Sequence, residues 1–371
     1  MESFRSNGFF FKVGAKGLFA GTVIGQARVV RRLKRLVERQ RVPHALLFVG
    51  AEGTGSVAAA LEFARIFHCE RGQSDACGAC RGCHKTALFN HPDFSILFPF
   101  SSRLKEEEER GALLEVVENP YGYRLPGESV THPVDQIRAL QKQFAYGTYE
   151  GAWRTAVILH ANKMRPEAAN ALLKTLEEPP DQSVMILTAP NLEGLLPTIV
   201  SRCQFVKFPA LSKQDISKVL QERMELEEDR SDWIARASSG SFRKALEMAT
   251  MDVDDFQGRA YRFLDALLWG EEARTYAALE QLAGDREDAF RVLQGAEIWL
   301  REVLFYHQGM GDFSGREDIE RLASAFDLEH VTKTVAKIES LREMNFRNVN
   351  LLTGFISLWR QVRRPVGQVV V

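Results

Sequence analysis

Long apolar runs, an excess of one charge and abundant cysteine are all missing from this sequence of 371 residues. No stretch of about 18 apolar residues occurs, so we expect no transmembrane helix. Lys12 and Lys16 interrupt the first apolar stretch, which therefore does not resemble a secretory signal. The 48 Lys and Arg nearly balance the 49 Asp and Glu, and the formal net charge is -1. Any contact with nucleic acid would therefore have to be local.

Cysteine is scarce but clustered, because four of the five cysteines fall within residues 69–83, CERGQSDACGACRGC. Clustering without a secretory signal favours a reducing, cytoplasmic location and a metal site over disulfides. Four thiolates can complete the tetrahedral shell of a structural Zn²⁺, with an iron–sulfur cluster as the alternative. We expect His68 and His84 to be bystanders and Cys203 to be a small buried hydrophobe. The predicted metal ligands are Cys69, Cys77, Cys80 and Cys83.

Residues 50–57, GAEGTGSV, have the glycine spacing of a phosphate-binding loop but lack its working residues. A functional loop ends in Lys and then Ser or Thr, which reach the terminal phosphates and hold Mg²⁺. Here Ser56 and Val57 occupy those two positions. The alternative is a glycine-rich turn without a nucleotide, although its backbone N–H groups could still hold an anion. We predict a degenerate loop whose remaining phosphate-contacting residues are Gly50, Gly53, Gly55 and Ser56.

A second part of a nucleotide-hydrolysing site is also absent. Such a site needs an acidic residue at the tip of a neighbouring strand, where it holds Mg²⁺ and orients water. The predicted strand at 154–161 ends in His160 and Ala161, and neither is a carboxylate. Two independent losses predict that this chain either does not bind ATP or does not hydrolyse it.

Hydrophobic periodicity predicts a fold of the α/β class followed by an all-α region. Short apolar runs predict buried strands at 44–50, 154–161, 183–190 and 203–210. Helical patterns lie between them, so we expect a parallel sheet with helices on both faces. Beyond residue 210 the patterns are helical only, and Ser212 is the predicted cap of the first helix there.

We divide the chain into three predicted domains. Residues 1–210 form the α/β domain, with the zinc module at 69–83 and an acidic insertion at 101–131 that we expect at the surface. Residues 211–253 form a small helical domain, a lid. Residues 254–371 form a larger helical domain, a collar for oligomerisation.

Several stretches resemble the clamp-loader family of bacterial DNA polymerase III, and more narrowly its delta-prime type. They are GQARVVRRLKRLVERQRVPHALLFVG, the cysteine cluster, HPDF, VDQIRAL, NKMRPEAANALLKTLEEPP, PTIVSRCQFVKF and GSFRKALEMA, between residues 25 and 250. The last third of the chain matches only in helical character and in NVNLLTGFISLW. The resemblance implies an AAA+ fold. The degenerate residues place the chain with delta-prime and apart from the ATPase subunits tau and gamma.

The resemblance also implies roles for single residues and partners. Arg202, beside Ser201 in the motif SRC, would act as an arginine finger on ATP held by the neighbouring subunit. Arg243 lies where active members place an Arg over their own nucleotide, and here we expect structural packing. The implied partners are tau or gamma ATPase subunits and a delta subunit in a hetero-pentameric ring, the sliding clamp, and primer-template DNA through the complex, without a membrane.

Two other functions remain as alternatives. The first is a catalytically active clamp-loader ATPase of the tau or gamma type, which would need the missing Lys and acidic residues. The second is a zinc-dependent nucleic-acid binder that acts alone. The near-zero net charge and a cysteine cluster with few basic and no aromatic residues between its ligands weigh against it.

Overall fold

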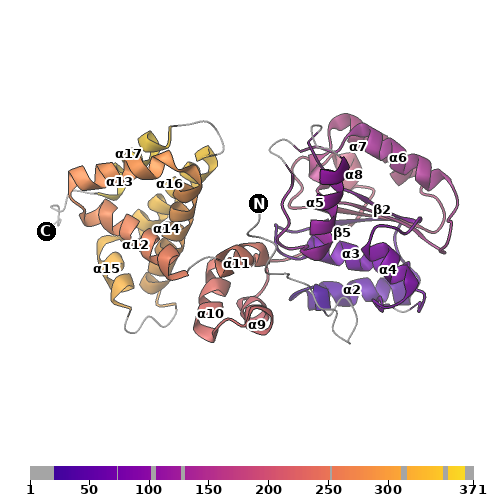
Figure 1. Cartoon of the computed structure of the whole chain (residues 1–371), viewed down its shortest axis with the longest axis horizontal. Coiled ribbons are helices and arrows are strands. Elements are labelled where there is room, and N and C mark those ends of the chain that lie inside the picture. The colour runs from indigo at the N-terminus through magenta and orange to yellow at the C-terminus, as the bar shows by residue number, and fades with distance from the viewer. Residues whose placement is uncertain are drawn as a thin grey trace. The chain divides into compact units, whose positions relative to one another are not determined.

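The structure is a computed structural model, and it describes residues 21–72, 74–101, 106–126, 130–250, 253–310, 316–345 and 350–363. Its internal contacts divide the chain into two compact units, Met1–Ala249 and Thr250–Val371 (Figure 1). The first unit holds the predicted sheet and the three helices that follow it. The predicted boundary between lid and collar at residue 253 remains a prediction.

A parallel five-stranded sheet, in the order β2-β3-β4-β1-β5, forms the centre of the first unit (Figure 1). Leu46 of β1 lies opposite Ile186 of β4 on one side and Gln204 of β5 on the other. The four predicted strands are confirmed, and an unpredicted fifth, β2, adds an edge. The strands are β1 Ala45–Val49, β2 Phe94–Leu97, β3 Arg154–Ile158, β4 Ser183–Ala189 and β5 Gln204–Lys207.

Helices cover both faces of this sheet, as the alternation of side chains along the strands requires. Leu47 packs with residues of α6 and α7 on one face, whereas Phe48 contacts Phe63 of α3 on the other. Figure 1 shows α6 and α7 on the opposite side of the strands from α3. The predicted α/β class is therefore confirmed. The helices of this part are α2 Ala27–Glu38, α3 Ser56–Ile66, α4 Arg81–Ala87, α5 Glu106–Glu118, α6 Val134–Ala145, α7 Pro166–Glu177, α8 Pro197–Val200 and the 3-10 turn η1 Ala161–Lys163.

Three further helices complete the first unit, namely α9 Lys213–Met224, α10 Glu228–Ala237 and α11 Phe242–Ala249. The predicted cap is confirmed, because the hydroxyl oxygen of Ser212 accepts a hydrogen bond from the backbone N–H of Asp215 at 3.1 Å. The start of α11 lies against the glycine-rich loop: the N–H of Phe242 donates to the carbonyl of Gly53 at 3.0 Å.

The second unit is helical throughout its described residues, which confirms the all-α region. Its core gathers buried apolar side chains from all of its helices, among them Leu293, Trp299 and Phe355. The helices are α12 Val253–Trp269, α13 Glu272–Gly284, α14 Arg286–His307, α15 Glu317–Ala325, α16 Leu328–Asn345 and α17 Leu351–Val362. Among the described residues of either unit, no helix is long and apolar enough to cross a membrane.

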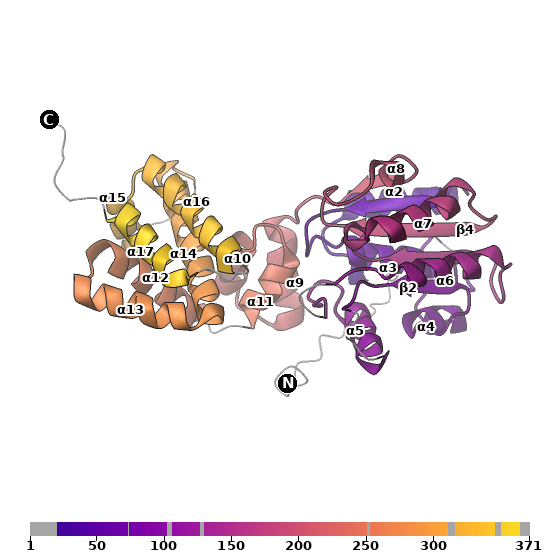
Figure 2. The same cartoon turned by 90° about the horizontal axis from the view of Figure 1, so that it is seen from above.

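The segment 101–131 departs from the predicted surface insertion. Its acidic helix α5 is half exposed and projects from the first unit (Figure 2). The chain after α5 turns inward, however, and Tyr121 and Tyr123 are buried. The prediction of a surface segment is therefore wrong for this part. Burying two large aromatic rings is favourable enough to draw the Gly- and Pro-containing chain around them into the fold.

Candidate functional site

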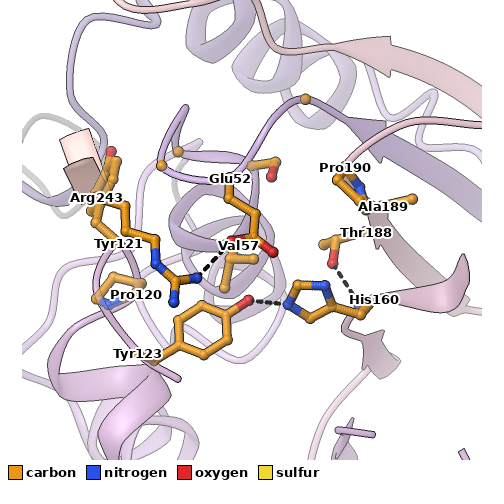
Figure 3. Close-up of a pocket in the computed structure, with 14 residues that line it drawn as sticks. Glu52, Val57, Pro120, Tyr121, Tyr123, His160, Thr188, Ala189, Pro190 and Arg243 are labelled. Atoms are coloured by element: carbon orange, nitrogen blue, oxygen red, sulfur yellow. Dashed lines mark hydrogen bonds and ion pairs between the residues drawn. The ribbon is translucent and has the colours of Figure 1, made fainter. Parts of the chain in front are cut away.

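A pocket lies at the carboxyl edge of the sheet, where the glycine-rich loop follows β1 (Figure 3). In a parallel sheet the carboxyl ends of all strands meet at this edge, which is where ligands bind in open α/β folds. Besides the loop, the lining comes from residues 120–123 after α5, from the ends of β3 and β4, and from the start of α11. The predicted loop residues Gly50, Gly53, Gly55 and Ser56 all belong to it.

The loop keeps the strand–loop–helix geometry of a phosphate site. Ser56 is the first residue of α3, and Gly55 before it has a φ of 94°, which favours glycine. Gln26 connects the loop to the chain after β5, because its side-chain amide donates to the carbonyls of Thr54 at 2.9 Å and Pro209 at 2.8 Å. The backbone scaffold of a phosphate loop is thus present.

Tyr121 fills the space beside the start of α3. Its side chain is 2% exposed, and its hydroxyl accepts a hydrogen bond from the N–H of Ile24 at 2.8 Å. A Cβ atom on Gly55 would lie 2.8 Å from that hydroxyl, so ring and loop are in direct contact. The ring of Phe242 packs edge-on against Tyr121 from the side of α11. Burial raises the pKa of Tyr121, so the hydroxyl stays neutral.

Tyr123 and His160 occupy the position where a hydrolase would carry its acidic residue. The Tyr123 hydroxyl and His160 Nε2 are 2.5 Å apart, and the backbone N–H of His160 donates to the hydroxyl of Thr188 at 3.1 Å (Figure 3). Burial, with smaller contributions from neighbouring positive groups, lowers the pKa of His160 to about 4. The imidazole is therefore neutral at pH 7. It is a poor ligand for Mg²⁺, which prefers oxygen.

Arg243 closes the pocket from the side of α11 by pairing with the loop itself. Its guanidinium lies 2.7 Å from the carboxylate of Glu52 (Figure 3). It also lies 3.5 Å from the carboxylate of Glu247. The hydroxyl of Ser241 also donates to the carbonyl of Glu52 at 2.7 Å. One hydrogen bond from Ser241 before α11, one from Phe242 at its start and the ion pair of Arg243 thus hold the helix to the loop.

These contacts decide how a nucleotide fits this pocket. The loop supplies no Lys for the terminal phosphates, and the one carboxylate in the lining, Glu52, is engaged by Arg243. Tyr121 and Tyr123 take up space beside the start of α3, where phosphates bind in a working loop. The residues present therefore do not fit Mg²⁺–ATP.

The four predicted metal ligands come together between α3 and α4. Their sulfur atoms all lie within 4.8 Å of one another, and the sulfurs of Cys77 and Cys83 are 4.0 Å apart. Zn–S bonds of about 2.3 Å in a tetrahedron would set sulfurs about 3.8 Å apart, so the donor set fits one ion. Backbone N–H groups of Cys77 and Cys83 donate to the sulfurs of Cys69 and Cys80, each at 3.4 Å.

A buried polar cluster anchors this module to the sheet. His68, next to the first cysteine, hydrogen-bonds the hydroxyl of Thr155 at 2.6 Å and lies outside the sulfur group, as predicted. Asp93 accepts bonds from the backbone N–H groups of residues 149–151 and pairs with Arg154 at 3.1 Å. Cys203 lies elsewhere, half-buried against the core, and all five cysteines are free of disulfides.

Arg202 lies on the turn between α8 and β5, away from the residues that line the pocket of its own chain. Its side chain is 35% exposed. The guanidinium pairs with Glu177 at the end of α7 at 2.7 Å and donates to the carbonyl of Thr198 at 3.0 Å. These contacts hold the group at the surface. The hydroxyl of the neighbouring Ser201 donates to the same carbonyl at 3.1 Å.

Sequence reasoning missed the residues that fill the pocket. Tyr121 and Tyr123 stand about 70 residues beyond the loop in a stretch rich in Gly, Pro and charge, which suggested solvent exposure. The available signal was the pair of aromatic rings inside an otherwise polar segment, since large rings are usually buried. Gln26 and Glu52 gave no signal of their own.

Comparisons with known proteins agree with this fold. A family model described as "DNA polymerase III, delta subunit" matches residues 25–212. The chain is 31% identical over 230 residues to DNA polymerase III subunit delta' of Bacillus subtilis, covering 62% of this chain and 60% of that protein. It is 25% identical to subunit tau of the same organism, covering 78% of this chain and 50% of tau. It thus spans 50 to 60% of the length of these relatives.

A solved structure of a DNA polymerase III gamma subunit-related protein from Thermotoga maritima is also similar. The alignment covers 90% of this chain and 98% of that one, with 17% sequence identity and a TM-score of 0.43. The family model covers half of the sequence, from the residues before the glycine-rich loop to the cap of α9. The chain therefore belongs to the DNA polymerase III delta subunit family, and it is similar to relatives of the delta-prime type.

Proposed function

We propose that this chain is a non-hydrolysing AAA+ subunit of the bacterial replicative clamp loader. Its partners would be ATPase subunits of the tau or gamma type and a delta subunit in a five-membered cytoplasmic ring. The ring would use ATP to load a sliding clamp onto primer-template DNA. The observation that carries the proposal is the pocket at the glycine-rich loop, which the protein fills with its own side chains.

The filled pocket favours a structural use of the loop over catalysis. Phosphoryl transfer requires a Lys, a metal ion and a residue that orients the nucleophile. Tyr121, Tyr123 and the pair of Arg243 with Glu52 stand in the space that these groups would need. They also join α11 to the loop without a nucleotide between them. The alternative, an active ATPase of the tau or gamma type, would have to expel these side chains first.

Arg202 is the group we propose to act on a neighbour's nucleotide. It is accessible, and Glu177 holds it at the surface near the end of α7. A planar guanidinium can bind phosphate oxygens with two parallel hydrogen bonds and stabilise charge as it develops. Ser201, one residue before it, would shape the turn through its bond to Thr198.

Zinc is the metal we propose for the four cysteines. Four thiolates leave no open coordination position, so the site is structural rather than catalytic. The module is small and has few apolar residues, and its cross-links would replace a core. Metal analysis of purified protein should find about one zinc per chain, whereas iron with visible absorbance would contradict this assignment.

The first experiment tests the non-hydrolysing role on the isolated chain. We expect no ATP turnover above background and no saturable binding of Mg²⁺–ATP by calorimetry. Ser56→Lys should leave both results unchanged, because Val57 and His160 still provide no metal ligand. Turnover that follows this chain through successive purification steps would contradict the proposal.

The second experiment tests Arg202 in a ring reconstituted with its ATPase and delta subunits. Arg202→Ala should leave assembly intact but strongly lower ATPase activity at the neighbouring site, since arginine fingers contribute about 10³ to 10⁵ in rate. The bulk loss is smaller because the other sites keep their fingers. Arg202→Lys should fail nearly as badly, because an ammonium lacks the planar fork.

Arg236→Ala is the matched control, since Arg236 is another exposed arginine of the first unit, on α10. It should leave the activity of the ring unchanged. If Arg202→Ala, Arg202→Lys and Arg236→Ala all match the wild type at the neighbouring site, Arg202 is only a surface charge and the finger assignment is wrong.

A further inference from the structure

Helix α2 carries a dense stripe of exposed arginines that the proposed function leaves unused. Arg28, Arg32 and Arg35 lie on the helix and Arg39 caps it, at intervals of four, three and four residues. On a helix with 3.6 residues per turn, this spacing places them within about 60° of one another. Arg31 extends the stripe. All are exposed, and with Arg41 they line a groove on the surface.

Among the described residues, none of the arginines of this stripe has an ion-pair partner, and Arg31 donates only to a backbone carbonyl one turn away. Glu38 lies on the same helix, and its carboxylate accepts a hydrogen bond from the hydroxyl of Ser74 at 2.9 Å. The carboxylate of Asp75, which lies next to α2, is taken by Lys34 at 2.6 Å. Like charges three or four residues apart destabilise a helix by about 0.2–0.5 kcal/mol per pair. A bound polyanion would remove this repulsion.

The chemistry of the groove favours phosphate over protein. Leu36 is its one apolar lining residue and no aromatic ring lines it, so it lacks the anchors that dominate protein interfaces. Arginine binds phosphate oxygens through its planar fork. The 12 residues of α2 span about 18 Å, along which one strand of a duplex presents about five phosphates.

We propose that α2 binds the phosphate backbone of double-stranded DNA through this arginine stripe, without reading sequence. The contact would give this subunit its own hold on the duplex, independent of the phosphate loop and of Arg202. The inference rests on the proposed function only for the choice of DNA as the polyanion. Its test uses the isolated chain, so its failure leaves the ATPase tests untouched.

The test measures anisotropy of a fluorescein-labelled 20-base-pair DNA duplex titrated with the full chain at several salt concentrations. We expect weak binding, with a dissociation constant of about 10⁻⁶ to 10⁻⁴ M that rises steeply with salt. The variant Arg28→Gln/Arg32→Gln/Arg35→Gln/Arg39→Gln should bind at least about tenfold more weakly and lower the slope of log K against log salt by about 3 to 4.

Two further variants separate the stripe from bulk charge and from misfolding. Arg236→Gln/Arg262→Gln/Arg274→Gln/Arg291→Gln removes the same charge from exposed positions elsewhere and should bind like the wild type. Four Arg→Lys changes in the stripe should keep the salt slope and weaken binding only a few-fold. Circular dichroism of each variant checks its folding.

Three results would overturn the inference. The first is no salt-dependent binding by the wild type up to about 10⁻⁴ M. The second is an equal loss of affinity in the stripe variant and the control variant. The third is tighter binding of labelled polyglutamate than of the duplex at the same salt, which would identify an acidic protein segment as the occupant of the groove.

Discussion

The glycine-rich loop and the cysteine cluster lie fewer than 20 residues apart in the sequence. They differ in whether the backbone geometry of a site comes together with the side chains that its chemistry needs. The loop has the backbone of a phosphate site, Ser56 and Val57 stand where a working loop has Lys and Ser or Thr, and Tyr121 and Tyr123 line the same pocket. The cluster has a complete set of four donors and almost no apolar core. The metal site takes all of its ligands from one short segment, so its chemistry can be predicted from that segment. The pocket is lined by residues from several distant segments, so its chemistry depends on the whole fold.

Loss of metal on removal of two of the four cysteines is the largest effect that we expect. Cys77→Ser/Cys83→Ser removes two of four thiolates, and metal content should fall from about one to less than about a tenth of an ion per chain. Inductively coupled plasma mass spectrometry after dialysis measures it. Tyr121→Ala is the control and should keep its metal. Full metal content in the double variant would contradict the four-thiolate site.

Removing the ring that fills the pocket should cost stability without restoring activity. Tyr121 is only 2% exposed, so Tyr121→Ala should lower the free energy of unfolding by about 3–5 kcal/mol in chemical denaturation. ATP turnover should stay absent, since no Lys or metal ligand is gained. Tyr149→Ala, at a residue 80% exposed, should change stability by less than about 0.5 kcal/mol. ATP hydrolysis by Tyr121→Ala would show that the ring alone silences the site.

Acid should weaken the pocket through His160. Its pKa is lowered from 6.5 to about 4 by burial, so between these values the unfolded chain binds more protons than the folded one. Its contribution is complete above about pH 6.5 and is lost as the pH falls toward 4, by up to about 3 kcal/mol. Unfolding free energies of the wild type and His160→Asn between pH 7.5 and 4.5 should converge. Parallel curves would mean that His160 titrates normally.

The pair of Arg243 and Glu52 should have the smallest effect, although it closes the pocket. Glu52 is half exposed, and pairs of this kind contribute about 1 kcal/mol or less. A double-mutant cycle of Arg243→Ala and Glu52→Ala should give a coupling energy in that range. A coupling well above 2 kcal/mol would make this pair, rather than Tyr121, the main contact between α11 and the loop.

Much of the first unit could be predicted because its signals are local. The apolar run at 45–49 and the glycines after it predict a strand and a turn, and Ser212 predicts a helix start. The edge strand β2 escaped prediction, since the short run FSIL resembles a loop between the metal module and the acidic helix. Its partner Thr155 lies about 60 residues away, and pairing over that distance leaves no pattern in either segment alone.

Residue identity alone predicted that the loop does not hydrolyse a nucleotide, because Ser56, Val57 and His160 cannot supply an ammonium or a carboxylate wherever the chain folds. The spacing of the four cysteines likewise predicted one metal site, since the C-x2-C-x2-C pattern with one more cysteine upstream can supply four thiolates to one ion. The occupant of the pocket was decided only by the tertiary structure. Tyr121 contacts Gly55 and Ile24, which lie about 70 and 100 residues away in the sequence. Hydrophobic burial is non-directional, so the sequence around Tyr121 does not show which distant residues will cover its ring.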